Sequence, residues 1–270
     1  MKRIALTGLA ALVGAIVLCA CDEDKKKAEI LAKTASTDAG SANPATSAAL
    51  VASSTPSAPT SAEAKRDVLC PTGPELALTD KDLEAELRLK LGKPKDPLKM
   101  SDLGNVKSLN LTKKQSLDEL DPCIIPKLTG LKHLYLGPGK LRDLTPIANL
   151  VGLESLRASI NEVEDLKPLE KLVLLDRLDL GRTHVRDIGP LANLVNLTEL
   201  QLDDTQVSDL APLAKDKKLE KVSIKHTNVI DVSPLKGLEK LKFLYVEGCA
   251  IGNLDTIQPL VGRGLRVVTK

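Results

Sequence analysis

The chain has 270 residues, with 38 basic and 36 acidic side chains and a formal net charge of +2. A balance so close to neutral, without a stripe of basic residues, argues against nucleic acid as a partner. The chain holds one phenylalanine, two tyrosines and no tryptophan, so its core must be aliphatic. The length predicts one folded domain of about 200 residues.

The N-terminus predicts a targeting segment. Lys2 and Arg3 precede an uncharged run that ends in Leu18-Cys19-Ala20-Cys21. A basic start before a short apolar stretch is typical of a secretory signal, and this stretch is too short to span a bilayer. The last four residues resemble a bacterial lipobox, which implies a lipoprotein signal peptide over residues 1–21 with an acylated Cys21 as the first mature residue. Plain secretion after cleavage is the alternative.

Acylation of Cys21 implies a protein of the bacterial cell envelope that is lipid-anchored and faces the extracytoplasmic side. The sequence does not distinguish the inner from the outer membrane. Loss of Lys2 and Arg3 with the signal lowers the 38 basic side chains to 36, which equals the 36 acidic ones. The mature chain is therefore formally neutral.

Residues 22–66 are charged at first and then dominated by Ala, Ser, Thr and Pro, with no aromatic residue. Such a segment has too few large apolar side chains for a core, so we expect a disordered tether. As a flexible chain it would reach roughly 35–40 Å from the membrane.

Residues 67–105 are predicted to form a helical cap. Apolar residues at helical spacing share one face, at Leu83, Leu87 and Leu91. Thr79 and Asp82 resemble a capping box at the start of this helix, and Gly92 suits its end.

A 22-residue period governs residues 106–262. Six lead leucines open successive units at five identical intervals, at Leu131, Leu153, Leu175, Leu197, Leu219 and Leu241. One degenerate unit precedes them, with a strand expected around Val106, Leu109 and Leu111 and an interval of 25 residues to the next. A fixed period of this length predicts a solenoid of stacked units. Residues 263–270 remain as a C-terminal cap or tail.

Each unit predicts one strand and one short return segment. Counted from the lead leucine, apolar residues recur at positions 1, 4, 6, 11, 14, 17 and 20. Positions 4 and 6 have period two, so positions 3–7 predict a short strand with 4 and 6 inward. Positions 13–17 read Asp-Leu-x-Pro-Leu, in which the aspartate caps a turn and the proline suits its first residues. So few residues favour 3₁₀ turns over an α-helix.

Polar residues stand at position 9 of most units of the repeat and at position 20 of one unit. Position 9 carries small, mostly hydrogen-bonding residues, which predict an internal ladder rather than a binding site, at Asn161, Thr183, Thr205, Thr227 and Cys249. Asp216 stands at position 20, where the other units carry leucine. We expect the coil that contains it to be locally weak on its convex side.

The repeat resembles the leucine-rich repeat family and, within it, the internalin-like bacterial class with 22-residue units. The resemblance covers Val106 to about Leu260, and the helical cap before it fits the same class. It implies an α/β solenoid: a right-handed superhelix with a parallel β-sheet on its concave face, short 3₁₀ segments on its convex face and an N-terminal helical cap.

Three cysteines remain once Cys19 is removed and Cys21 is acylated. Cys70 and Cys123 both fall near the open N-terminal end of the core in an oxidising compartment, so we expect them to form a disulfide. Two reduced thiols are the alternative. Cys249 lies in the position-9 ladder and is expected to be inert. No Cys/His spacing suggests zinc, and we expect neither a metal nor a cofactor.

Catalysis finds little support in the sequence. The three histidines fall on different coils and different sides of the turn, at His133, His184 and His226. The aspartates at position 13 form the single carboxylate column, at Asp143, Asp165, Asp187, Asp209 and Asp231. Calcium binding there is conceivable, but capping explains the same residues. We therefore expect no enzyme.

The outward strand positions, 3 and 5, hold all three aromatic residues of the chain. Exposed aromatics with arginine nearby are typical of protein-binding hot spots. The candidate partner-binding residues are His133, Tyr135, Arg157, Arg177, Asp179, Glu199, Phe243 and Tyr245. Two structural explanations compete: residues 264–268 cover Phe243 and Tyr245, or Arg177, Glu199 and Lys221 pair as a charge ladder.

The interpretation that follows is a non-catalytic, membrane-anchored leucine-rich repeat protein. It would act as a monomer and bind a macromolecule, most simply a protein, through its concave face. A structural spacer of the envelope and a regulatory subunit that docks on an enzyme are the alternatives.

Overall fold

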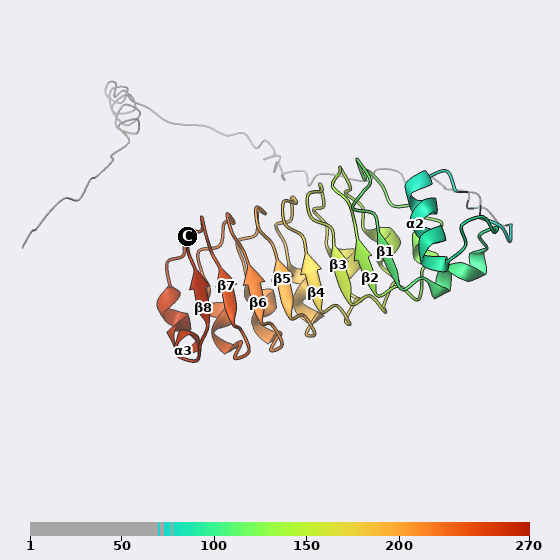
Figure 1. Cartoon of the computed structure of the whole chain (residues 1–270). Coiled ribbons are helices and arrows are strands. Elements are labelled where there is room, and N and C mark those ends of the chain that lie inside the picture. The colour runs from blue at the N-terminus through green and yellow to red at the C-terminus, as the bar shows by residue number, and fades with distance from the viewer. Residues whose placement is uncertain (1–69, 71–72, 77) are drawn as a thin grey trace, which may run out of the picture. The chain divides into compact units, whose positions relative to one another are not determined.

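The computed structural model describes Cys70, residues 73–76 and residues 78–270. The predicted signal peptide with Cys21 and the predicted tether at residues 22–66 lie outside the described residues. Within the described part, the repeats form a regular stack of coils with strands along one side and short helical turns along the other (Figure 1).

The predicted N-terminal helix is present as α2 (Lys81–Leu91), but its start differs from the prediction. The N-cap is Asp80, whose Oδ1 accepts the backbone N–H groups of Asp82 and Leu83 at 3.0 and 3.1 Å. Thr79 therefore stands outside the helix, because the Asp80 carboxylate accepts the N–H groups that a capping side chain would bind. The helix ends at Gly92 with φ of 64°, as expected.

Helix α2 and the 3₁₀ segment η1 (Met100–Asn105) close the N-terminal end of the stack. Leu83 and Leu87 are buried against the first coil. The Glu86 carboxylate accepts the backbone N–H of Asn110 at 3.1 Å, which satisfies a donor on the outer edge of the first strand. The cap thus covers both the apolar core and an exposed sheet edge.

Eight three-residue strands pair in parallel and in sequence order to form one sheet. They are β1 (Ser108–Asn110), β2 (His133–Tyr135), β3 (Ser155–Arg157), β4 (Arg177–Asp179), β5 (Glu199–Gln201), β6 (Lys221–Ser223), β7 (Phe243–Tyr245) and β8 (Arg266–Val268). Between β2 and β7 each residue pairs with the one 22 positions later. Identical positions of the repeat therefore lie side by side.

Strand β8 differs from the sequence prediction, which gives residues 263–270 only as a C-terminal cap or tail. Phe243 pairs with Arg266, an offset of 23 rather than 22, and Gly264 occupies the place of the lead leucine. The extra residue and the missing leucine remove the periodic signal. The backbone still pairs, so the sheet continues for one more strand.

The return segments are 3₁₀ turns, as predicted. They are η2 (Ile125–Lys127), η3 (Thr145–Ile147), η4 (Lys167–Leu169), η5 (Gly189–Asn193), η6 (Ala211–Lys215), η7 (Ser233–Gly237) and η8 (Leu254–Ile257), and a short helix α3 (Gln258–Val261) follows the last. The position-13 carboxylates each accept the N–H two residues later at 2.7–2.8 Å, at Asp143, Asp165, Asp187, Asp209 and Asp231. Hydrogen bonds from Asn253 and Ser233 lower the pKa of Asp231.

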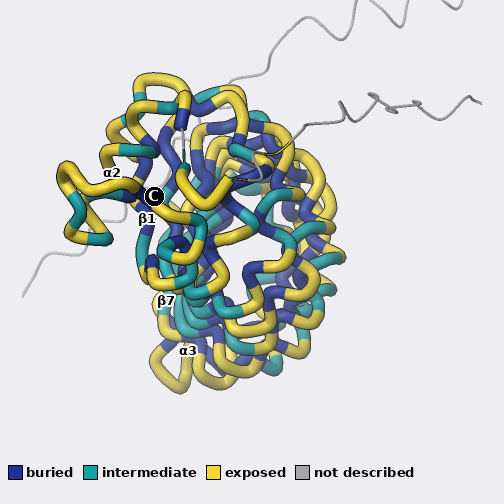
Figure 2. The backbone as a smooth tube through the Cα atoms, turned by 90° about the vertical axis from the view of Figure 1, so that its right-hand side faces the viewer, coloured by how far each residue is buried: buried dark blue, intermediate teal, exposed yellow. Residues whose placement is uncertain are grey.

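One continuous aliphatic core runs through the stack from Leu78 to Leu265. In Figure 2 the buried positions fall on the inner side of successive coils. Burial of seven aliphatic side chains contributes on the order of 10 kcal/mol per coil before chain entropy is subtracted. Because the core side chains of each coil pack against those of the neighbouring coils, no coil is stable alone.

The position-9 ladder is an internal structural feature. The hydroxyls of Thr183, Thr205 and Thr227 each donate to a carbonyl three residues earlier at 2.7 Å. Asn161 donates to the Gly137 carbonyl at 3.0 Å, which joins neighbouring coils. Cys249 is half-buried rather than buried.

Cys70 and Cys123 are joined in a disulfide with their Cα atoms 5.4 Å apart. The bond ties the segment before α2 to the insertion that follows the first strand, so it closes the frayed end of the solenoid. Its formation in the isolated protein stays a prediction. The length of the loop that it closes, 53 residues, sets the expected gain in stability.

Replacement of Cys70 and Cys123 by serine should lower the free energy of unfolding by about 4 kcal/mol, because the unfolded chain regains the entropy of that loop. Urea denaturation of both forms measures the difference. Peptide mapping without reductant that recovers both thiols free would show that the bond does not form.

Asp216 is a buried carboxyl in a row of leucines. Its side chain is 5% exposed, and its Oδ2 has no hydrogen-bond partner among the described residues. Only the Lys218 N–H approaches Oδ1, at 3.4 Å. Burial raises the pKa of Asp216 to about 7. The coil therefore carries the weak point that its sequence predicted.

This burial makes stability depend on pH. Folding favours the protonated carboxyl, so stability should fall as the pH rises from about 4 to about 7 and then level off. Asp216→Leu should therefore raise the free energy of unfolding by on the order of 3 kcal/mol at pH 8. At pH 4 the gain should be smaller. Asp216→Asn is the control without charge, and parallel pH profiles for wild type and both variants would contradict the account.

Candidate functional site

The sheet presents two rows of outward side chains, which together we call the sheet face. The position-3 row is Ser108, His133, Ser155, Arg177, Glu199, Lys221, Phe243 and Arg266. The position-5 row is Asn110, Tyr135, Arg157, Asp179, Gln201, Ser223, Tyr245 and Val268. The leucine or valine between them points into the core, so the pleat fixes which side chains are available.

The first half of the sheet face is basic and aromatic. Tyr135 and Arg157 are paired across β2 and β3, and Arg177 follows on β4. These residues line a shallow hollow of about 240 Å³, together with Ser155, Leu156, Leu178, Asp179, Glu199 and Gln201. Arg157 is exposed, so its guanidinium is open to a partner.

Arg157 is held in place by a local polar network. Its Nε lies 3.1 Å from the Asp179 carboxylate and donates to the Ser159 hydroxyl at 3.2 Å. The Ser159 hydroxyl donates to the same carboxylate at 3.2 Å. An arginine fixed in this way loses less side-chain entropy when it binds.

The centre of the sheet face is acidic, with Asp179 and Glu199 on neighbouring strands. Glu199 lies between Arg177 and Lys221 in the register, as a charge ladder would require. In the described residues, however, no ion pair joins Glu199 to either cation, and Arg177 pairs instead with Asp176 at 3.7 Å. The charge-ladder explanation therefore receives no support from the contacts.

The last half of the sheet face is again aromatic and basic. The Phe243 and Tyr245 rings stack with centroids 6.4 Å apart. Lys221 and Lys225 lie over the Tyr245 ring at 5.9 and 5.5 Å, and Arg266 lies over Phe243 at 6.0 Å. Strand β8 thus flanks the rings from the side, and both remain half-buried.

A second hollow of about 400 Å³ lies beside this aromatic pair. It is lined by Asp176, Arg177, Thr198, Glu199, Glu220, Lys221, Lys242 and Phe243. Arg177 and Glu199 border both hollows, so the two form one continuous polar surface across the middle strands.

The structure places all eight predicted site residues on one face, where five of them fall into two clusters and Asp179 and Glu199 lie on the strands between. Tyr135, Arg157 and Arg177 form one, and Phe243 with Tyr245 forms the other. His133 lies at the N-terminal end, where its Nδ1 is buried without a hydrogen-bond partner among the described residues.

The sequence pattern does not predict two of the cations that lie over the aromatic rings. Lys225 stands at position 7, outside the two rows considered. Arg266 belongs to the unexpected eighth strand. An extension of the repeat by one irregular coil would have revealed Arg266, but nothing in the sequence marks Lys225.

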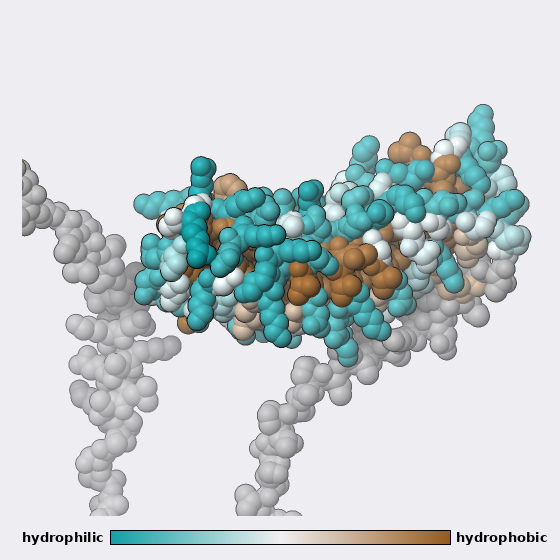
Figure 3. Space-filling view, turned by 90° about the horizontal axis from the view of Figure 1, so that it is seen from below, coloured by the Kyte–Doolittle hydropathy of each residue, from teal (hydrophilic) through white to brown (hydrophobic). Residues whose placement is uncertain are grey.

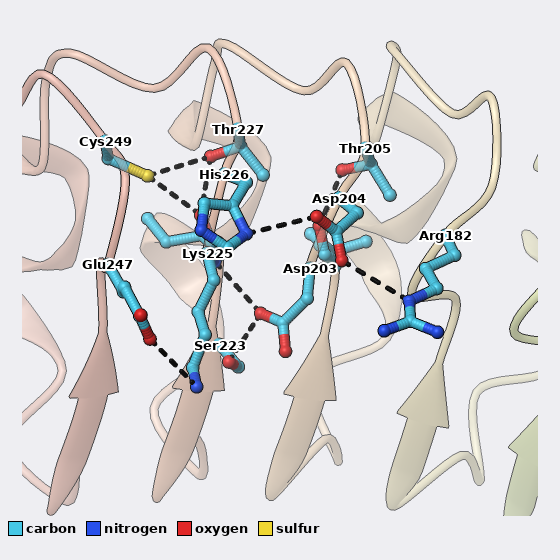
Figure 4. A network of polar contacts seen from close by, with 12 residues as sticks. Arg182, Asp203, Asp204, Thr205, Ser223, Lys225, His226, Thr227, Glu247 and Cys249 are labelled. Carbon is cyan, nitrogen blue, oxygen red and sulfur yellow. Dashed lines mark hydrogen bonds and ion pairs between the residues drawn. The ribbon is translucent and has the colours of Figure 1, made fainter. Parts of the chain in front are cut away.

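A row of polar side chains lies just beyond the C-terminal ends of the strands (Figure 4). The Asp204 carboxylate lies 3.5 Å from Arg182 Nε and 3.1 Å from His226 Nδ1. All three residues have positive φ, between 51° and 56°. Gly248 continues the row because a Cβ there would lie 2.2 Å from the His226 ring. This row ties neighbouring turns together.

These polar groups do not assemble a recognisable catalytic centre. His226 and Asp204 form a pair, but the Cys249 thiol donates to the Ile224 carbonyl at 2.9 Å and contacts the Thr227 hydroxyl at 3.3 Å. Across the described residues, no group of three or more His, Cys, Asp or Glu side chains is placed to hold a metal ion.

Comparison with known proteins places the fold. No protein-family model matches the sequence, and no curated protein matches it. An internalin (inlF) from Listeria monocytogenes is similar in structure, with a TM-score of 0.63 and 28% identity over 70% of this chain and 55% of its own. Internalin C2 from the same organism has a TM-score of 0.60 and 25% identity, over 71% of this chain and 93% of its own.

A leucine-rich repeat protein from Leptospira interrogans shares the fold, with a TM-score of 0.57 and 24% identity over 63% of this chain and 44% of its own. The chain thus spans just over half the length of the first internalin. The fold is a leucine-rich repeat solenoid, and its structural neighbours are bacterial leucine-rich repeat proteins. None of the helices described is long and apolar enough to cross a membrane.

Proposed function

We propose that this chain is a non-catalytic binding protein that recognises a protein partner through its sheet face. The observation that carries the proposal is the placement of the aromatic residues. The whole chain holds only one phenylalanine and two tyrosines, and all three stand on this face beside arginine or lysine. Aromatic and arginine side chains carry most of the energy in protein interfaces.

The aliphatic core does not need these rings. Each of the three is half-buried, with one side available to a partner. Eight strands at the inter-strand spacing span roughly 35 Å, which suits a standard protein interface. A structural spacer would have no use for such a surface, so its aromatic and basic clusters favour binding.

The charge order sharpens the expected partner. The cluster of Tyr135, Arg157 and Arg177 on one side and the cluster of Phe243, Tyr245 and nearby lysines on the other flank the carboxylates of Asp179 and Glu199. Opposite charges meet across specific interfaces. A partner with two acidic or apolar contact points on either side of a basic one would fit this order.

We further propose that acylated Cys21 anchors the protein in the bacterial envelope, with the solenoid on the extracytoplasmic side as a monomer. The support is the N-terminal sequence, in which a basic start and an apolar run lead to Leu18-Cys19-Ala20-Cys21. The two internalin neighbours come from a bacterium, which is consistent with a bacterial protein.

Removal of the aromatic and basic anchors should abolish binding without unfolding the domain. Tyr135→Ala with Arg157→Ala, and separately Phe243→Ala with Tyr245→Ala, should each weaken partner capture from envelope extracts at least tenfold, on the order of 2 kcal/mol. Mass spectrometry of the captured proteins identifies the partner that is lost.

The control for this test is a core change. Leu178→Ala should lower the melting temperature strongly, because it removes buried apolar volume. If a surface pair destabilises the fold as much as Leu178→Ala does, its residues are structural. Undiminished capture by both surface pairs would refute binding through the sheet face.

Anchoring has its own test. Cys21→Ser should leave the protein unprocessed or soluble, because the thiol that accepts the lipid is gone. Detergent-phase partitioning and metabolic labelling with a fatty acid measure the change. Label retained by the Cys21→Ser variant would contradict acylation at this residue, and Cys249→Ser is the matched control that should behave as wild type.

A further inference from the structure

A second surface lies on the edge where each coil leaves its 3₁₀ segment and enters the next strand. We call it the strand-entry edge, formed by positions 21 and 22 of each unit. In three consecutive coils it carries large aliphatic side chains that are 43–56% exposed, at Val151, Val173, Leu174 and Val195. Figure 3, which views this edge directly, shows an apolar patch over the middle coils.

The patch is continuous because the coils touch along this edge. The Asn196 side chain donates to the Val173 carbonyl at 2.7 Å. The Lys218 amine donates to the Asn196 side chain, also at 2.7 Å. The aliphatic coils therefore pass directly into a basic stretch.

That stretch carries three exposed lysines at positions 21 and 22, which are Lys217, Lys218 and Lys240. Two more exposed lysines, Lys215 and Lys236, stand two and three positions before the edge in the same coils. Lys217 bonds only to the carbonyls of Ala214 and Gly237, so these contacts do not neutralise its charge. Of the acids nearby, Asp216 is buried and Glu239 pairs with Arg263 at 3.1 Å. The edge is thus apolar in one half and positive in the other.

The backbone N–H groups of the lead leucines and the Val173 carbonyl, which lie under the patch, already have hydrogen-bond partners. The N–H groups of Leu153, Leu175 and Leu197 donate to carbonyls three residues earlier at 2.9–3.1 Å. The Val173 carbonyl accepts from Asn196. These groups would therefore stay paired if lipid replaced the water around the turns, and they would add no cost of lost hydrogen bonds.

The composition distinguishes this edge from a protein interface. Protein hot spots are rich in tyrosine, tryptophan and arginine and poor in lysine. The strand-entry edge has the reverse composition, with valine, leucine and lysine and no aromatic residue. Aliphatic side chains beside lysines are typical of surfaces that insert shallowly into an anionic bilayer.

We propose that the strand-entry edge docks on an anionic phospholipid surface. The valines and Leu174 enter the boundary between headgroups and acyl chains, and the lysines meet lipid phosphates. Because the strands run away from this edge, docking leaves the sheet face uncovered (Figure 1). The proposal requires neither the lipid on Cys21 nor the partner of the sheet face.

The test uses the chain from Asp22 to Lys270, which carries every described residue and no acyl group. Binding is measured by sedimentation with vesicles of phosphatidylethanolamine, with or without phosphatidylglycerol. Val173→Ser with Leu174→Ser, and separately Lys217→Gln with Lys218→Gln, should each weaken binding to the anionic vesicles about tenfold. Binding of the wild type should also weaken as salt rises.

Matched variants elsewhere on the solenoid control for general effects. Ile230→Ser removes an even more exposed aliphatic side chain away from the edge, and Lys113→Gln with Lys140→Gln removes two exposed lysines. Both should bind as wild type does. All forms retain residues 22–69, so any contribution of that segment cancels.

Two results would overturn the proposal. One is vesicle binding that is absent, or unchanged by both edge variants. The other is a dimer that the Val173→Ser/Leu174→Ser variant converts to a monomer while vesicle binding stays the same, since the patch would then join two copies of the chain. Hydrogen exchange at residues 149–152, 171–174 and 193–196, which should slow on anionic vesicles, locates the contact independently.

Discussion

The stacking of aliphatic side chains between neighbouring coils is the interaction on which the rest of the structure depends. A single coil cannot bury its leucines, whereas a coil between two others buries nearly all of them. Leu156, Leu178 and Leu200 stand in register at position 4 and are at most 2% exposed. This register holds the outward residues at fixed separations, so the same contacts that stabilise the fold also position the sheet face.

A one-dimensional stack is weakest at its ends and at irregular coils, because each coil depends on its neighbours. At the N-terminus, α2 covers the core and Glu86 satisfies the sheet edge. At the other end, β8 extends the sheet past Phe243 and brings Arg266 over its ring. Within the stack, Asp216 interrupts the leucine column and leaves a buried oxygen without a partner. The solenoid therefore combines protected ends with one coil whose stability falls as the pH rises.

Most of the fold was predictable because the same pattern of apolar and turn residues recurs in each 22-residue unit. The strands, the 3₁₀ turns and the inward leucines all follow from the 22-residue period. Prediction failed where the chain departs from that rule. The offset of 23 before β8 hid the last strand, and Asp80 took the N-cap that a motif had assigned to Thr79.

The candidate site was predictable in part. Register alone places Tyr135, Arg157 and Phe243 outward, since side-chain direction follows the pleat. It does not predict that Lys225 reaches across to the Tyr245 ring, because the reach of a long side chain depends on the turn after the strand. The strand-entry edge was missed for another reason. Its valines and Leu174 stand at positions 21 and 22, outside the seven apolar positions of the repeat, so the period gives them no role. Their exposed fractions of 43–56% come from the structure.

We propose that this solenoid binds its protein partner with the sheet face rather than with the side of the 3₁₀ turns. Gln201 lines the first hollow on the sheet face, and Glu170 is exposed next to η4 on the other side. A photo-activated crosslinking residue placed at each of these positions in living cells tests the claim most directly. The account predicts a specific adduct from position 201 and none from position 170. An adduct from position 170 alone would contradict it.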